Sequence, residues 1–287
     1  MPEQMQRGTP AKFGASEAGM LGKQDALFAR LRSLGSVLVA FSGGADSAYL
    51  AWAASRVLGN RALAVTALSP SFSAYDRECS AAAVREMKLN HEFIESREFE
   101  NPLYVANDAA RCYHCKAELF GKLAQLRSER GFAAIAYGVN ADDLHDFRPG
   151  HRAASEHGVL APLLEANLTK AELRTLSNRA GLSTWDRPAS PCLASRVPYG
   201  TQVTIENLSR IERAEAVLRN FGFRQFRVRL HDDLARIEID PQELPRALEP
   251  AMADAIAEGV QSAGFARVAL DRQGYRQGSL NAALNAK

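Results

Sequence analysis

The chain has 287 residues, of which 46% are hydrophobic, and its 35 basic and 33 acidic residues leave a formal net charge of +2. This near-neutral balance predicts neither a nucleic-acid partner nor a membrane partner, and no apolar stretch approaches the roughly 20 residues of a membrane span. The length suits two domains. We therefore expect a cytoplasmic protein in which the four cysteines are reactive or metal-binding rather than disulfide-bonded.

Residues 1–20 lack the apolar region of a secretory signal and are predicted to form a disordered tail. Short apolar runs then alternate with helical patterns. The predicted elements are helix 22–34, strand 37–41, helix 46–58, strand 62–68, helix 77–87, strand 92–95, helix 117–130, strand 133–139 and helix 169–180, with Thr169 as an N-cap. This alternation predicts a doubly wound parallel sheet, whose ligands bind beyond the carboxyl ends of the strands.

The pattern changes near residue 200, after a stretch at 187–204 that contains three prolines and a glycine. The predicted elements beyond it are helix 204–220, strands 225–230 and 234–239, helix 242–258 and strand 265–270. We therefore predict an α/β domain over residues 21–190 and a smaller α+β domain, of α-β-β-α-β order, over residues 191–287.

The string Ser-Gly-Gly-Ala-Asp-Ser at 42–47 lies between the first predicted strand and its helix. Glycines allow a tight turn and a close approach to a ligand, and the amides at a helix N-terminus bind anions. A carboxylate in such a cradle makes sense if Mg²⁺ bridges it to phosphates. We therefore predict a nucleotide phosphate site. Its members are Ser42, Gly43, Gly44, Asp46 and Ser47. A glycine-rich turn of another doubly wound protein is the alternative.

Three further candidates follow the strand predicted at 133–139. Gly138, Asp142 and Asp143 leave this strand at its carboxyl end, which is the edge where the 42–47 loop also begins. Ligands of parallel sheets gather at that edge, so these residues are predicted to complete the nucleotide site. Either aspartate could instead cap a helix.

Cys112 and Cys115 form a C-x-x-C pair. Such a pair is consistent with a redox centre, half of a zinc site or part of an iron–sulfur site. We disfavour the redox interpretation because the pair does not open a helix after a first strand; the predicted helix begins only at Ala117. Burial as ordinary packing residues is the remaining alternative.

Cys192 lies in the segment between the predicted domains, where a ligand cleft is expected. Arg187 and Arg196 flank it, and nearby cations favour the nucleophilic thiolate. We therefore predict a catalytic cysteine, with a structural linker cysteine as the alternative. Cys79 stands in a helical pattern and is predicted to be a small packing residue.

The 42–47 string resembles the PP-loop of the N-type ATP pyrophosphatases, which split ATP between its α and β phosphates. Four later motifs occur in the order seen in the LarE family, so the chain from about residue 22 to about residue 282 resembles that family. The motifs are Gly138-x-Asn140-x-Asp142-Asp143, Asp146 to Gly150, Cys192-x-x-Ser195-Arg196-x-Pro198-Tyr199-Gly200-Thr201 and Arg227-Val228-Arg229. The family consists of ATP-dependent sulfur transferases that build the nickel-pincer nucleotide cofactor of lactate racemase.

The resemblance implies a mechanism. A carboxylate of pyridinium-3,5-biscarboxylic acid mononucleotide attacks the α-phosphorus of ATP, and pyrophosphate leaves into the 42–47 loop while Asp46 holds Mg²⁺. Sulfur then attacks the acyl-adenylate to give a thiocarboxylate and AMP. In one branch of the family the position of Cys192 donates its own sulfur. A second branch resembles enzymes in which three cysteines hold a 4Fe-4S cluster, and the presence of Cys112 and Cys115 favours that branch here.

The resemblance also implies substrate-binding residues. They are Arg148, Arg196, Arg227, Arg229, Glu215 and Glu238. Arg227 and Arg229 occupy alternate positions of a predicted strand and so share one face, where guanidinium forks suit a phosphate. A solvated strand face is the alternative for these arginines, and salt-bridge partners are the alternative for the glutamates.

The small-molecule mononucleotide is thus the expected partner, and a homo-oligomer, a hexamer by family analogy, is the expected assembly. Two other functions stay open on the sequence. One is a tRNA-thiolating or ligase-type PP-loop enzyme, which the lack of a basic excess disfavours. The other is a non-catalytic nucleotide-binding iron–sulfur carrier.

Overall fold

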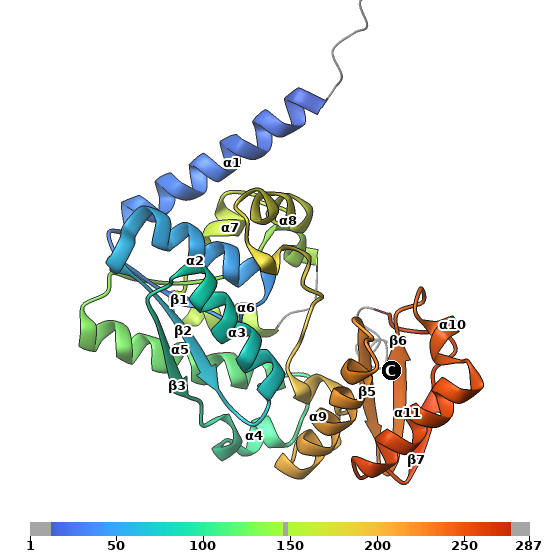
Figure 1. The fold of residues 1–287 in the computed structure, drawn as a ribbon. Helices are drawn as coiled ribbons and strands as arrows, with labels where there is room; N and C mark the ends of the chain where they lie inside the picture. The colour runs from blue at the N-terminus through green and yellow to red at the C-terminus, as the bar shows by residue number, and fades with distance from the viewer. Residues whose placement is uncertain (1–12, 146–148, 277–287) are drawn as a thin grey trace, which may run out of the picture.

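The computed structural model describes residues 13–145 and 149–276. They form two lobes joined by an extended segment, residues 187–204, which we call the linker (Figure 1). The first lobe holds a parallel sheet in the order β3-β2-β1-β4. Its strands are β1 (Val37–Ala40), β2 (Ala62–Leu68), β3 (His91–Glu95) and β4 (Ala134–Tyr137). The predicted α/β class is therefore confirmed. The strand order reverses between β1 and β4, which makes this the switch point where ligands of such sheets bind.

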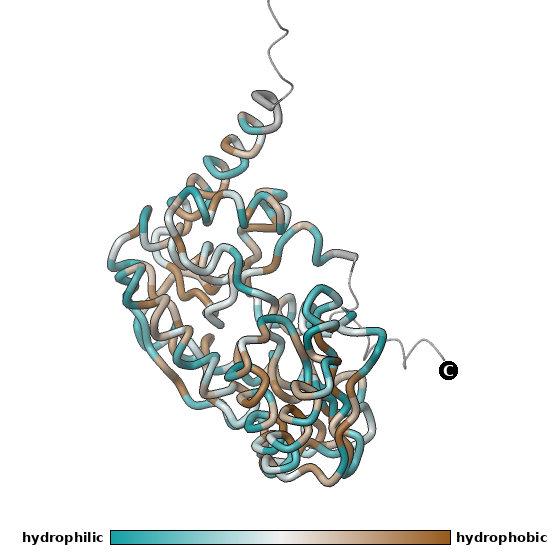
Figure 2. Tube along the Cα trace, turned by 45° about the vertical axis from the view of Figure 1, so that its right-hand side comes forward, coloured by the Kyte–Doolittle hydropathy of each residue, from teal (hydrophilic) through white to brown (hydrophobic). Residues whose placement is uncertain are grey.

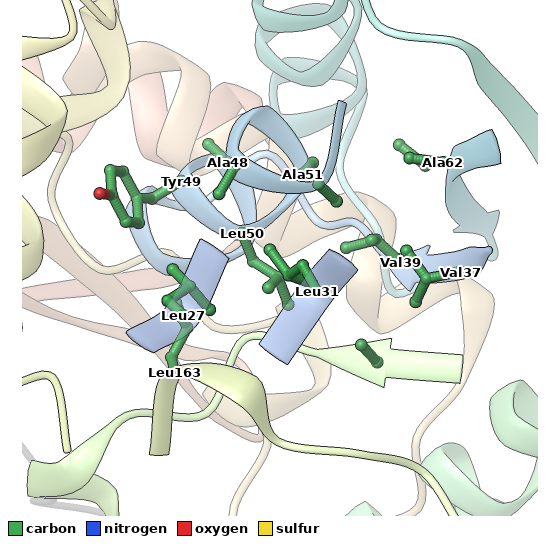
Figure 3. Close-up of a cluster of buried hydrophobic side chains, with 14 of the residues drawn as sticks. Leu27, Leu31, Val37, Val39, Ala48, Tyr49, Leu50, Ala51, Ala62 and Leu163 are labelled. Carbon is green, nitrogen blue, oxygen red and sulfur yellow. The ribbon is translucent and has the colours of Figure 1, made fainter. Parts of the chain in front are cut away.

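Helices cover both faces of this sheet. Alternate residues of β1 point to opposite faces, so Val37 and Val39 join one apolar cluster and Leu38 joins the other. The first face packs α1 (Phe13–Leu34), α2 (Ala45–Leu58), α3 (Ala74–Met87), α7 (Pro162–Glu165) and α8 (Lys170–Arg179). Figure 3 shows Leu27 and Leu31 of α1 meeting Leu50 of α2 there. The second face packs α5 (Arg111–Arg130) and α6 (Pro149–Glu156).

The second lobe has a mixed three-stranded sheet in the order β5-β6-β7. Strands β5 (Phe226–His231) and β6 (Leu234–Ile239) pair antiparallel, and β7 (Arg267–Leu270) runs parallel to β6. Helices α9 (Ile205–Asn220), α10 (Leu244–Ala247) and α11 (Pro250–Ser262) complete this lobe. Its apolar cluster begins at Leu193 of the linker and includes Tyr104 from the first lobe, so the lobes share packed side chains.

Several boundaries differ from those predicted. Helix α1 begins at Phe13, inside the tail predicted for residues 1–20, and extends past the first lobe (Figures 1 and 2). Helix α5 begins at Arg111 rather than Ala117, so the C-x-x-C pair does open a helix, although one that follows β3. The helix predicted at 242–258 is two helices separated before Pro250. The sequence analysis missed α4 (Pro102–Val105), α6 and α7.

Gly138 allows the end of β4 to approach the first turn of α2. A Cβ atom at this position would lie 2.8 Å from Ser47 N and 2.9 Å from Ser47 Cα, and these backbone atoms cannot swing aside. We expect Gly138→Ala to lower the free energy of unfolding by about 1–3 kcal/mol, as overpacking does. Urea denaturation followed by circular dichroism measures this difference.

Gly121→Ala is the matched control for that measurement. Gly121 lies within α5, and the nearest neighbour of its added Cβ outside the helix backbone, His157 Cε1, would lie 3.8 Å away. Alanine is favoured over glycine inside a helix by about 1 kcal/mol, so the control variant should be at least as stable as the wild type. Equal stability of the two variants would contradict the close approach at Gly138.

Candidate active site

The loop after β1 has the geometry of an anion cradle. Gly43 adopts a φ of +73°, and a side chain there would lie 2.4 Å from Ser80 Oγ. Gly44 is the N-cap residue of α2 and supplies no side-chain cap. The first amides of a helix have no carbonyl to bind within the helix and attract anions. The two serines brace the turn, because Ser42 N–H donates to Ser47 Oγ over 3.2 Å and Ser47 Oγ–H donates to Gly44 O over 3.0 Å.

Asp46 lies in the first turn of α2, and the loop after β4 orients it. The fully buried Asn140 donates from Nδ2 to Asp46 Oδ2 over 3.0 Å. Asn140 also receives the Asp142 N–H on its Oδ1 over 3.0 Å, so one amide side chain links both predicted nucleotide-binding loops. The sequence motif contained Asn140, but its role as the link between the loops was not predicted.

Asp142 and Asp143 both bind Lys170. Asp142 Oδ2 accepts the Lys170 N–H at the start of α8 over 2.7 Å, which is the helix-cap role left open by the sequence. The buried Asp143 pairs with Lys170 Nζ over 2.9 Å and accepts the Asn140 N–H over 3.2 Å. These contacts hold the loop in place, and nucleotide binding by either aspartate stays a prediction. Arg148 lies outside the described residues.

The linker that carries Cys192 is held through its carbonyl groups by arginines from several elements. The pairs are Arg227 Nη2 to Ala189 O (2.5 Å), Arg196 Nη1 to Cys192 O (3.1 Å) and to Pro191 O, Arg111 Nη1 to Ala194 O (2.7 Å), and Arg229 Nη1 to Ser195 O (2.9 Å). Arg187 at the start of the linker donates to the Gly43 carbonyl over 2.8 Å. The segment therefore has a fixed path between the glycine loop and the second lobe.

Two of the predicted substrate arginines form buried ion pairs. Arg196 binds Glu215 through two bonds of 2.8 and 3.0 Å. Arg229 donates twice to Glu238 Oε2, over 2.9 and 3.1 Å. Burial would raise the pKa of Glu215, but the charge and hydrogen bonds of Arg196 outweigh it and hold that pKa below its usual value. The two glutamates are thus salt-bridge partners of the arginines, as the alternative interpretation of the sequence proposed. Substrate contact by either pair stays a prediction.

Arg227 differs from its neighbours because it forms no ion pair with a carboxylate among the residues that the structure describes. Its guanidinium donates to the carbonyls of Phe226 and Ala189, each over 2.5 Å, and lies 5.0 Å from the Tyr275 ring centre. Burial and the like charge of Arg196 lower the pKa of Arg227 to about 10. An anionic ligand at Arg227 would therefore offset part of the electrostatic cost of burying this cation.

A cavity of about 500 Å³ lies between the lobes. Its walls come from α3, the linker, α9 and β5, and five arginines contribute to them: Arg187, Arg196, Arg219, Arg224 and Arg227. The wall also includes Cys79, which the sequence analysis took as a packing residue, whereas Cys192 is absent from the lining. The cleft expected at the linker is therefore present, and its wall is rich in cations.

The three other cysteines gather beside the linker. Cys112 and Cys115 lie in the first turns of α5. The charge of Cys192 adds to the rise in the pKa of Cys115, and the charge of Cys112 adds to the rise in the pKa of Cys192. Arg111 lies next to them, with Nη2 at 3.9 Å from Cys112 Sγ. Thiolates are soft ligands that suit iron–sulfur clusters. Cluster binding by these three cysteines stays a prediction.

The predicted thiolate at Cys192 is contradicted by its surroundings. Burial raises the pKa of this thiol, and the cation that most opposes the rise is Arg111, with Arg196 contributing less. Arg187, which the sequence placed beside Cys192, is engaged by Gly43 and Asp76 instead. Arg187 is close to Cys192 in the sequence, but Arg111 is the cation that most opposes the rise in the Cys192 pKa. Cys112, by contrast, is exposed.

Glu98 is a buried carboxylate that the sequence analysis missed. Its Oε1 accepts hydrogen bonds from Ser69 Oγ (2.8 Å) and Ser71 Oγ (2.5 Å), and only 3% of the residue is exposed. Burial first, and then the Glu98 carboxylate, raise the pKa of Cys115 well above its usual value. No local sequence pattern marks Glu98, because its partners come from the loop after β2 and from α5.

Within the described ranges, no group of three or more His, Cys, Asp or Glu is arranged so that it could hold a metal ion.

Comparison with known proteins places the chain in a family. It is 34% identical over 265 residues to the pyridinium-3,5-bisthiocarboxylic acid mononucleotide synthase of Lactiplantibacillus plantarum, covering 92% of this chain and 95% of that protein. The chain belongs to the LarE family. An uncharacterised Synechocystis protein is 43% identical, covering 88% of this chain and 94% of its own length, and an uncharacterised Methanocaldococcus jannaschii protein is 26% identical, covering 84% and 90%. No family model matches the chain.

For this LarE-family chain the structure thus groups the predicted residues into three places. The glycine loop, Asp46 and Gly138 meet at the β1–β4 switch point. Arg196, Arg227 and Arg229 hold the linker, with Glu215 and Glu238 as ion-pair partners of two of them, and Cys112 and Cys192 lie near Arg111. No helix in the described part of the chain is both long enough and apolar enough to cross a membrane. Arg111 and Glu98, which were not predicted as site residues, contact residues distant in the chain, and so does Asn140, whose bond to Asp46 was not predicted.

Glu215→Gln tests the buried pair. The change leaves Arg196 as a buried cation without its carboxylate, which costs about 3–5 kcal/mol in comparable pairs. Because the pKa of Glu215 is depressed below 4.5 in the fold, its contribution is complete above that pH and is lost as the pH falls further. The stability gap between wild type and variant, measured by urea unfolding at several pH values, should therefore narrow below about pH 4.5.

Glu165→Gln serves as the control for that series. Glu165 pairs with Arg30 over 2.6 Å, but both side chains are more than one-third exposed. An exposed pair contributes about 0–1 kcal/mol, so its loss should be small at every pH. A Glu215→Gln protein as stable as the control would mean that the buried pair does not hold the linker.

Proposed function

We propose that this chain is an ATP-dependent sulfur transferase that converts a carboxylate of pyridinium-3,5-biscarboxylic acid mononucleotide into a thiocarboxylate, with release of AMP and pyrophosphate. The observation that carries the proposal is the path of the linker. It leaves the glycine loop at Arg187, forms part of the cavity wall and carries Cys192 to the same apolar cluster against which Cys115 packs. The name of the Lactiplantibacillus plantarum relative supports the same substrate class.

The first step activates the acceptor. A carboxylate is a poor electrophile, so its oxygen attacks the α-phosphorus of ATP and pyrophosphate leaves. The amides at the start of α2 and the positive end of its dipole would stabilise the leaving charge. Asp46, oriented by Asn140, would hold a Mg²⁺ ion that neutralises the phosphates. The acyl-adenylate so formed is a reactive electrophile, because AMP is a good leaving group for the next step.

The cavity between the lobes suits the acceptor. Its volume falls within the range of ordinary small-ligand sites, about 300–1,000 Å³. The substrate carries a phosphate and two carboxylates, and Arg227 enters the cavity without a carboxylate partner in the described residues. Arg219 adds a second cation, whose nearest carboxylate, Glu215, lies 3.9 Å away. An anionic ligand would therefore offset the positive charge gathered in this wall.

The second step brings sulfur to the acyl carbon. Cys112, Cys115 and Cys192 would hold a 4Fe-4S cluster, which when bound supplies a sulfide for attack on the adenylate. Arg111 would balance the negative charge of the assembled thiolates. Alternatively the Cys192 sulfur itself attacks, displaces AMP and forms a thioester. Elimination then breaks the Cβ–S bond with loss of the Cα proton, which leaves thiocarboxylate and dehydroalanine. Assembly as a homo-oligomer stays a prediction.

A product assay tests the reaction. Protein incubated with ATP, Mg²⁺ and the dicarboxylate mononucleotide should release pyrophosphate and AMP in equal amounts. Asp46→Asn should reduce the rate by roughly 100-fold, because an electrostatic contact to the reacting phosphates is lost. Asp254→Asn, an exposed aspartate in α11, should leave the rate unchanged. Release of ADP and orthophosphate would refute the mechanism, and no turnover at all would favour a nucleotide-binding carrier.

Iron content and colour test the sulfur source. Anaerobically purified protein should be brown, and Cys112→Ala, Cys115→Ala and Cys192→Ala should each lose colour and iron. Cys79→Ala should keep both, because Cys79 lies in the cavity wall on α3. A wild-type protein that stays colourless when iron and sulfide are supplied would exclude the cluster. Intact-mass analysis after one turnover then shows whether Cys192 has lost its sulfur.

A further inference from the structure

Arg187 is the first residue of the linker to contact the glycine loop, and its guanidinium bridges two elements. Nη1 donates to the Gly43 carbonyl and Nη2 donates to Asp76 Oδ1 of α3, both over 2.8 Å. Asp76 is itself held, because Ser73 Oγ–H donates to its Oδ2 over 2.6 Å and Ser190 Oγ–H lies 3.3 Å from the same atom. Asp76 therefore fixes one side of the guanidinium, and the other side binds the loop at the Gly43 carbonyl.

The bond to Gly43 O holds a peptide unit whose own N–H makes only a long contact, of 3.4 Å, to Ser42 Oγ. The unit joins two glycines, and glycine accepts positive and negative φ with similar ease, so this peptide can rotate at small steric cost. The chain has no cis peptide in its described part, and a trans peptide points its carbonyl and the following N–H in opposite directions. Holding Gly43 O therefore sets the direction of the Gly44 N–H.

The Gly44 N–H is one of the donors of the cradle. Gly44 is the N-cap residue of α2, and its N–H makes only a long contact of 3.4 Å to Ser42 Oγ. A stronger acceptor, such as a phosphate oxygen, could take this donor without the loss of a good hydrogen bond. The direction of this N–H is thus a variable on which the binding of phosphate depends.

We propose that Arg187 is a positioning residue that locks the Gly43–Gly44 peptide in the orientation that binds the β and γ phosphates of ATP. The inference rests on the proposed function, because it assumes that the 42–47 loop binds a nucleotide. It adds a residue from the linker to the nucleotide site. Lysine cannot replace the arginine fully, because one ammonium group does not offer the planar fork that spans Gly43 O and Asp76.

The test compares ligands that use the cradle with one that does not. Dissociation constants of Mg²⁺-ATP, Mg²⁺-pyrophosphate and AMP are measured by calorimetry on the full-length protein without acceptor. Arg187→Gln should raise the dissociation constants of ATP and pyrophosphate about tenfold. It should leave the dissociation constant of AMP within twofold, because AMP lacks the β and γ phosphates. Arg187→Lys should recover part of the loss. A variant that is merely misfolded would lose AMP binding as well.

Arg267→Gln is the matched control. Arg267 pairs with Asp233 over 2.6 Å at an exposed position, and it neither lines the cavity nor contacts the loop. Its ATP and pyrophosphate affinities should stay within twofold of the wild type. Asp76→Asn keeps the Gly43 bond and weakens the anchor, so its loss should be smaller than that of Arg187→Gln.

The outcomes separate this inference from the proposed function. Wild-type protein that binds neither ATP nor pyrophosphate would refute the nucleotide site and the inference with it. Wild-type protein that binds both, with an Arg187→Gln variant that binds pyrophosphate equally well, would refute only the inference. A variant with unchanged pyrophosphate affinity but a raised KM for the dicarboxylate mononucleotide would make Arg187 an acceptor-binding residue instead.

Discussion

The buried arginines around the linker are the constraint on which the site depends. A guanidinium taken from water must recover its hydrogen bonds and its counter-charge inside the protein. Arg196 and Arg229 do so by binding a glutamate with one part of the fork and a linker carbonyl with another. The same bonds that make their burial tolerable therefore also determine the path of the segment that carries Cys192.

A second constraint is the close approach of backbone segments at the switch point. Gly138 brings the end of β4 against Ser47, and Gly43 brings the turn against Ser80. A side chain at Gly138 would push the end of β4 away from the start of α2, whereas one at Gly43 would collide with Ser80 of α3. The close approach at Gly138 keeps the loop that carries Asn140 next to Asp46. The candidate nucleotide site therefore depends on these two glycines as well as on its polar residues.

Local sequence predicted those elements whose signals are local. The strand at 62–68 and the strand at 234–239 were predicted with the bounds observed, and Thr169 forms the expected cap as part of a capping box. The start of α5 was missed because its first turn is polar and its N-cap, Ala110, makes no side-chain bond. The helix predicted at 242–258 was split by Pro250, which starts a new helix more readily than it continues one.

The partners of the charged residues could not be predicted, because they come from distant parts of the chain. Arg187 was read as a neighbour of Cys192, yet it contacts Gly43 and Asp76, both more than 100 positions earlier. Glu98 and Cys115 likewise meet only through the fold. Sequence motifs therefore identified which residues gather near the site, whereas the sign of the shift in the Cys192 pKa required the burial that only the structure supplies.

The two lobes are joined so that neither can move away without exposing the linker. Arg111 from the first lobe and Arg229 from the second hold carbonyls of adjacent residues, Ala194 and Ser195. Separating the lobes would leave at least one buried guanidinium without its acceptor, and such a loss costs several kcal/mol for a buried charge. Hinge opening across this segment is therefore expensive. The geometry favours a site whose loop, cavity and thiols keep fixed relative positions while ligands enter and leave.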